Sequence, residues 1–228
     1  MTEFTYTNHP ALYYESMLAD RVRTSLERAL WFLVPSAVGY LALGDVIVGA
    51  LYQTGAFGET ETLITWGVLG AYALGLPASA GSRVLSSAFY ALRDTRTPAR
   101  MAYVRVAVSV VVGVSLMIPA DRFGISTLRL GAAGLAAGSA VGAWIEYVLL
   151  RRALGRTIGP HGTSTRAVLD LVLAACAAAL VAVSLQLLLP PAHPIVVAAE
   201  TLPAFGVLYL GASAALGRGI PLRRRKHA

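Results

Sequence analysis

The sequence has little charge and almost no cysteine, and each shortage excludes a class of protein. Charged residues make up 14% of the 228 residues, against about 25% in an average soluble domain, so an ordinary soluble fold is excluded. Cys176 is the single cysteine, which excludes a disulfide within the chain. The apolar run around Cys176 predicts a small side chain that fills the core and carries no reactive thiolate.

The patterns of metal, nucleic-acid and catalytic sites are also missing. The four histidines stand far apart, so we expect no metal site and no cofactor. The net charge is +7, but the basic residues form short clusters between apolar blocks. That arrangement favours loops beside an anionic membrane leaflet over nucleic acid. No catalytic triad or carboxylate pair falls at one depth in the apolar blocks, so we expect no enzyme.

What the sequence does contain is long apolar runs. A membrane-spanning helix needs about 20 predominantly apolar residues, and none of the runs alternates with the period of a strand. We therefore predict an all-α, polytopic membrane helical bundle with six transmembrane helices. The six blocks are residues 30–51, 63–92, 101–119, 130–150, 167–189 and 195–216.

The basic residues orient these spans. Of the 19 Lys and Arg residues, 15 fall in the terminal segments and the connections on one side of the membrane. Arg122 and Arg129 fall on the other side, and Arg83 and Arg105 fall within blocks. The positive-inside rule therefore predicts that both termini are cytoplasmic. Before the first block, apolar residues at helical spacing over 18–29 predict either an amphipathic surface helix or a plain extension of the first span.

Arg83 is the charged residue placed deepest in a predicted span. It precedes Arg93 by ten residues, which in a straight helix is about 15 Å, close to the midplane of a hydrocarbon core about 30 Å thick. We interpret Arg83 as a cation that faces a polar cavity and binds an anionic substrate. The alternatives are a buried ion pair, or a helix that breaks near Pro77 and ends early.

A second charged pair is predicted at a shallower level. Arg105 lies five residues inside Arg100, and Glu146 lies five residues inside Arg151. Because the two blocks run antiparallel, both side chains should sit about 7–8 Å below the same surface. We predict a structural salt bridge between Arg105 and Glu146.

Glycines recur every fourth residue in the fourth block, at Gly134, Gly138 and Gly142. Small residues at this spacing lie on one helix face and let a neighbouring backbone approach closely. We predict close helix packing, with a sliding surface in a moving transporter as the alternative.

An ordered series of short motifs runs through the first four blocks. It comprises residues 51–57 (LYQTGAF), 72–77 (YALGLP), 83–85 (RVL), 88–90 (AFY), 93–98 (RDTRTP) and 131–135 (GAAGL). In order and spacing the series resembles the MviN/MurJ family, the bacterial lipid II flippases of the multidrug/oligosaccharidyl-lipid/polysaccharide exporter superfamily. The resemblance extends from about Arg21 to Arg218 and covers only the C-terminal part of the family pattern of fourteen spans.

The resemblance implies a division of the chain into five parts. Residues 1–29 are a cytoplasmic segment with an amphipathic helix, 30–152 are four helices of the second flippase lobe, and 153–166 are a cytoplasmic loop. Residues 167–216 are the appended pair of transmembrane helices, which in the family forms a groove for the lipid tail, and 217–228 are a basic cytoplasmic tail. Arg83 alone matches a family position for a cavity cation, and Ser109 and Gly113 replace the family's sodium-site residues.

The function that the resemblance implies is translocation of an undecaprenyl-diphosphate-linked peptidoglycan precursor across the bacterial inner membrane by alternating access. The implied partners are that lipid-linked precursor, membrane lipids, and another chain that carries the missing N-terminal helices. Nucleic acid is not an expected partner. The alternatives are export of another lipid-linked oligosaccharide or of a drug, and a truncated membrane scaffold that transports nothing.

Overall fold

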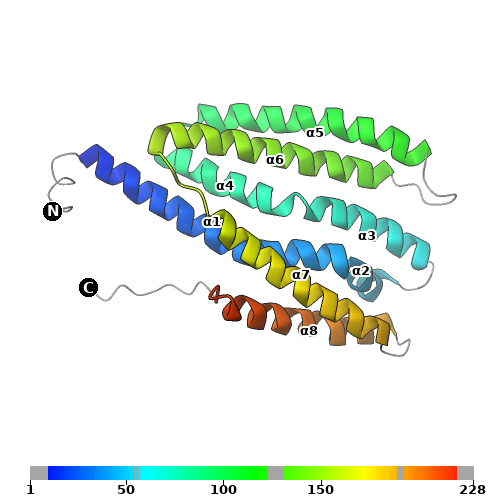
Figure 1. Ribbon diagram of the computed structural model, residues 1–228. Helices are drawn as coiled ribbons and strands as arrows, with labels where there is room; N and C mark the ends of the chain where they lie inside the picture. The colour runs from blue at the N-terminus through cyan, green and yellow to red at the C-terminus, as the bar shows by residue number, and fades with distance from the viewer. Residues whose placement is uncertain (1–9, 54, 56, 123–130, 189–192, 220–228) are drawn as a thin grey trace.

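The computed structural model describes residues 10–53, 55, 57–122, 131–188 and 193–219, and every regular element in this part is a helix. Figure 1 shows the helices packed side by side as a bundle, with α5 and α6 at one edge and α7 and α8 at the other. The elements are α1 (Pro10–Ala42), α2 (Gly44–Tyr52), α3 (Glu59–Ala73), α4 (Leu76–Ala91), α5 (Arg96–Arg122), α6 (Gly131–Ile158), α7 (Thr165–Leu188) and α8 (Pro194–Ala215).

The helices match the predicted spans, so the all-α membrane bundle is confirmed. Five helical stretches in the described part are long and apolar enough to cross a membrane, and one of them is the combined α3 and α4, Glu59–Ala91. The pair α1 and α2 makes a sixth span when it is counted as one, with a bend of 75° between its two parts. The chain is thus a polytopic membrane protein.

The segment before the first span is continuous with it. Helix α1 runs from Pro10 to Ala42 without interruption, and its residues Val22 and Leu26 are buried against Leu85 of α4 and Leu150 of α6. The apolar side of residues 18–29 therefore packs on protein.

A second apolar cluster joins α7 and α8 to the rest of the bundle. Trp31 and Val34 of α1 are buried with Leu171 and Ala175 of α7 and Tyr209 of α8. Cys176, the next residue along α7, is exposed. The expectation that it fills the core was wrong, because composition does not reveal which face of an apolar helix points outward.

The arginine-rich ends of the helices meet at one end of the bundle. In Figure 1 the start of α1, the α4–α5 and α6–α7 connections and the end of α8 all lie at the left. The alternation of helix direction needed for the predicted topology is therefore present. Arg129 and the basic residues 223–226 lie outside the described residues.

Candidate functional site

The polar residues predicted for the site gather around one cavity among α4, α5 and α6. The cavity has a volume of about 340 Å³. Its lining combines serines from α4 with charged side chains from all three helices: Ser79, Ser82, Arg83, Ser86, Ser87, Tyr90, Arg105 and Glu146. The structure thus brings Arg83, Arg105 and Glu146, which come from three different predicted spans, to a single place.

Arg83 lines this cavity as a cation, and no partner for it lies in the described part of the chain. Its side chain is exposed, and it makes no hydrogen bond or ion pair with the residues that the structure describes. The helix is interrupted at Leu74–Gly75, before Pro77, and α4 then continues past Arg83 to Ala91. The alternative of a helix that ends before Arg83 is therefore wrong, because Arg83 lies about 12 Å before the end of α4.

The break between α3 and α4 is held by a side chain from α6. The indole N–H of Trp144 donates a hydrogen bond of 2.9 Å to the carbonyl oxygen of Leu74. Gly75 packs so tightly that a Cβ atom there would lie 2.9 Å from the Cα of Ala140. Backbone groups freed within a span need new partners, and Trp144 is one that sequence reasoning did not identify.

Arg105 and Glu146 lie together as an interhelical ion pair. Nη1 of Arg105 is 3.0 Å from Oε2 of Glu146, and the two side chains are 33% and 9% exposed, respectively. A second guanidinium nitrogen, Nη2, lies 3.4 Å from the hydroxyl of Ser79 on α4. The pair therefore connects α5 to both neighbouring helices at the wall of the cavity. Because Glu146 is the more buried of the two, its carboxylate depends on Arg105 for charge compensation.

The glycine stripe of α6 faces α5 at the level of this pair. A Cβ atom at Gly142 would collide with the side chain of Ser109 and lie 2.8 Å from the carbonyl oxygen of Arg105. At Gly138 it would collide with the backbone of Gly113. Close approach of the two helices at Gly142, one turn before Glu146, is therefore what brings Arg105 within reach of the carboxylate.

The turn that carries the RDTRTP motif connects the end of α4 to the start of α5. Oδ1 of Asp94 accepts backbone N–H bonds from Arg96 (2.9 Å) and Thr97 (3.0 Å), and Oδ2 accepts the Thr97 hydroxyl at 2.6 Å. These bonds, first of all the one from the Thr97 hydroxyl, lower the pKa of Asp94 below its usual value. Asp94 is thus a helix cap that fixes the start of α5.

Three residues fasten the end of α8 to α1 and α7, and the sequence analysis did not predict their contacts. Arg218, just after α8, lies 3.1 Å from Oδ2 of Asp170 on α7. Its backbone carbonyl accepts the indole N–H of Trp31 at 2.8 Å. These contacts join residues up to 187 positions apart, so local spacing gives no signal for them.

The groups that line the Arg83 cavity are suited to binding an anion. No group of three or more His, Cys, Asp or Glu side chains lies there in a position to hold a metal ion. The cavity instead offers the guanidinium of Arg83, which has no partner among the described residues, together with several hydroxyl groups and a salt bridge at its wall. Such a set can neutralise and hydrogen-bond an anion at membrane depth.

Comparison with known proteins gives a consistent result. A family model described as lipid II flippase MurJ matches residues 10–198. A probable lipid II flippase MurJ from Rhizobium tropici is 33% identical over 127 residues, which are 55% of this chain and 22% of that protein. A lipid II flippase MurJ from Thermosipho africanus is 39% identical over 74 residues, 32% of this chain and 16% of that protein.

The fold has a counterpart among solved structures. A lipid II flippase MurJ in an inward closed conformation superposes with a TM-score of 0.66 at 21% identity, over 90% of this chain and 42% of that one. The chain spans about a fifth of the length of the curated relatives that it matches first.

Proposed function

The chain belongs to the lipid II flippase MurJ family, and from this premise we propose that it is the C-terminal part of a transporter for a lipid-linked cell-wall precursor. The family match over residues 10–198 supports this proposal. The precursor carries a diphosphate and an undecaprenyl tail, and it crosses the bacterial inner membrane by alternating access.

The free guanidinium of Arg83 is the observation in this chain that carries the proposal. A charged side chain deep in a membrane is costly, and it is retained where it faces a polar cavity or a partner. Arg83 lines such a cavity with hydroxyl groups around it. We assign it the role of a contact for the diphosphate, since a guanidinium binds phosphate oxygens with paired hydrogen bonds.

The remaining spans of the family fold complete the transport path. The chain covers 42% of the solved flippase chain, which supports a central cavity that is completed by spans outside the described helices. Helix α5 offers a surface for these spans, because its apolar residues Val106, Val110 and Val111 are exposed. We propose that the remaining helices dock beside α5 and close the cavity opposite Arg83.

Translocation of lipid II tests this function. Proteoliposomes would contain the remaining spans of the flippase with or without this chain, and externally added lipid II would be followed by its accessibility to a membrane-impermeant probe. We expect translocation only when both parts are present. An equal rate without this chain would contradict the proposal and favour a scaffold. Equal transport of an unrelated drug would instead favour a general exporter.

A further inference from the structure

Two neighbouring cavities at the arginine-rich end of the bundle lie outside the proposed transport site. The larger, of about 680 Å³, lies where α6 ends and the chain turns toward α7. The smaller, of about 230 Å³, lies among α1, α4, α6 and α7. Tyr147 and Arg151 line both cavities, so the two spaces meet at these side chains.

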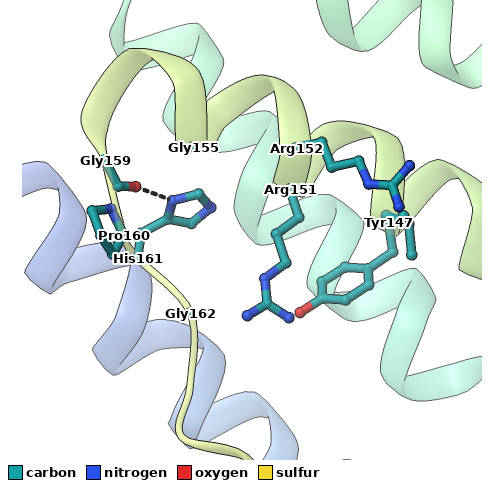
Figure 2. A pocket seen from close by; sticks show the side chains of 9 residues that line it. Tyr147, Arg151, Arg152, Gly155, Gly159, Pro160, His161 and Gly162 are labelled. Carbon is teal, nitrogen blue, oxygen red and sulfur yellow. Dashed lines mark hydrogen bonds between the residues drawn. The ribbon is translucent and has the colours of Figure 1, made fainter.

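The larger cavity is cationic. Its nine lining residues include Arg151, Arg152 and His161, and none of the nine is Asp or Glu. Neither arginine forms an ion pair or hydrogen bond with another residue in the described ranges. Figure 2 shows the Arg151 side chain extending beside Tyr147, with His161 facing it from the loop. Unpaired guanidinium groups gathered around a cavity favour an anion with several acceptor oxygens.

His161 supplies a buried polar atom that needs a partner. The residue is 4% exposed, and its Nδ1 lies 2.8 Å from the carbonyl oxygen of Gly159, to which the ring donates. The other ring nitrogen, Nε2, is buried without a hydrogen-bond partner among the described residues. In Figure 2 this nitrogen is on the side of the ring that faces Arg151. Nε2 is thus a buried polar atom at the wall of the larger cavity that a bound ligand could satisfy.

The smaller cavity is mainly apolar. Leu26 and Leu30 of α1, Pro77 of α4 and Val168 of α7 contribute to its lining. A free inorganic anion would gain no binding free energy from this apolar surface. An acyl chain would, because it would bury the apolar surface away from water. The combined site is therefore amphipathic, with cations at one end and hydrocarbon at the other.

We propose that this site binds an anionic phospholipid of the membrane. The phosphodiester lies between Arg151, Arg152 and His161, and an acyl chain enters the apolar cavity beside Leu26 and Val168. Basic pockets between transmembrane helices are suited to anionic headgroups. The site shares no lining residue with the Arg83 cavity, so the proposal does not depend on the transported substrate.

Lipid retention by the purified chain tests this proposal. The chain would be taken from nanodiscs of phosphatidylcholine and phosphatidylglycerol, and the lipids that stay bound would be counted by native mass spectrometry. We expect selective retention of phosphatidylglycerol. Arg151→Gln should lower it about tenfold, as for the loss of a hydrogen bond to a charged group. Arg151 is exposed and has no described partner, so this variant should fold.

Matched variants separate a built site from general surface charge. Arg156→Gln removes the same charge from the same helix but does not touch the cavity, and it should retain the lipid as the wild type does. Val168→Phe fills the apolar cavity and should reduce lipid retention. Equal losses in Arg151→Gln and Arg156→Gln would overturn the proposal.

Competition identifies the source of the phosphate group. Excess inorganic phosphate should leave the bound phosphatidylglycerol in place. If it displaces the lipid, the site binds free phosphate and the assignment to a lipid is wrong. Displacement by an equal amount of undecaprenyl diphosphate would assign the site to the transported precursor and would likewise overturn the proposal.

Discussion

The hydroxyl of Tyr209 on α8 donates a hydrogen bond of 2.7 Å to the backbone carbonyl oxygen of Trp31 on α1. That carbonyl lacks its usual helical partner, because residue 35, four positions later, is a proline inside α1 and has no N–H to donate. Tyr209 therefore replaces the missing hydrogen bond and at the same time holds α8 against α1.

Removing this hydroxyl should destabilise the protein in a way that depends on Pro35. Tyr209→Phe leaves the Trp31 carbonyl buried and unpaired, and we expect it to lower the free energy of unfolding by about 1–3 kcal/mol. In a Pro35→Ala background the alanine N–H can bond that carbonyl, so the same change should cost less. Unfolding in detergent micelles measures all four proteins of this cycle. An equal cost in both backgrounds would refute the link.

The two partners of the Arg105–Glu146 pair should respond unequally to substitution. Arg105→Met leaves the nearly buried Glu146 carboxylate uncompensated, for which about 3 kcal/mol or more is expected. Glu146→Gln leaves a guanidinium that is a third exposed and still near Ser79, so its cost should be smaller. The midpoints of unfolding of the two variants show which substitution costs more stability. If the exchanged pair Arg105→Glu with Glu146→Arg recovers none of the lost stability, direct pairing is not what stabilises this contact.

Gly142 should be intolerant of even a methyl group. Its added Cβ would collide with Ser109 and crowd the Arg105 carbonyl on α5, and crowding of a packed interface typically costs about 1–3 kcal/mol. Gly211→Ala is the matched control, because a Cβ at Gly211 in α8 meets open space. That change should be neutral, or stabilising by up to about 1 kcal/mol, since alanine favours helix over glycine. Similar effects of the two changes on unfolding would argue against a packing role for the glycine stripe.

The Asp94 cap should lose its contribution to stability only in acid. Its pKa is lower in the folded chain than the ordinary value because the Thr97 hydroxyl and backbone N–H groups bond the carboxylate. The stabilisation is therefore fully present above the ordinary aspartate pKa of about 3.9 and is lost as the pH falls through the lowered folded value. The stability difference between wild type and Asp94→Ala should shrink over that window. A difference that stays constant with pH would assign the effect to something other than the carboxylate.

Hydropathy was sufficient to predict the six apolar blocks, because it responds to the membrane and not to neighbouring helices. It did not predict the bend between α1 and α2 or the break between α3 and α4. Counting residues from the loops placed Arg105 and Glu146 at one depth, since the rise of a helix is fixed. Depth does not specify direction around the helix axis. For that reason the sequence did not show that Cys176 is exposed or that Trp144 bonds Leu74.

The remaining contacts depend on tertiary packing of distant segments. The break between α3 and α4 lies at Leu74–Gly75 and not at the nearby proline. Its position follows from the close approach of Gly75 to Ala140 on α6, which no local pattern encodes. The same holds for Arg218, which pairs with Asp170 on α7.

Arg83 gives the prediction that bears most directly on transport. Its guanidinium has no partner in the described part of the chain, so Arg83→Gln should leave the midpoint of unfolding nearly unchanged. If the guanidinium contacts the diphosphate, the same variant should slow lipid II translocation at least tenfold, because a hydrogen bond between two charged groups contributes about 1.5–3 kcal/mol.

The conservative variant distinguishes a charge contact from a structural role. Arg83→Lys keeps the positive charge but loses the paired hydrogen bonds, so its translocation rate should fall between those of the wild type and Arg83→Gln. Ser87→Ala, at the same cavity wall, serves as the control for a small change that leaves the charge in place. Equal rates for wild type and Arg83→Gln would remove Arg83 from the transport path. A loss of stability that accompanies the loss of rate would instead make Arg83 part of the packing, because a free cavity cation contributes to binding and not to folding.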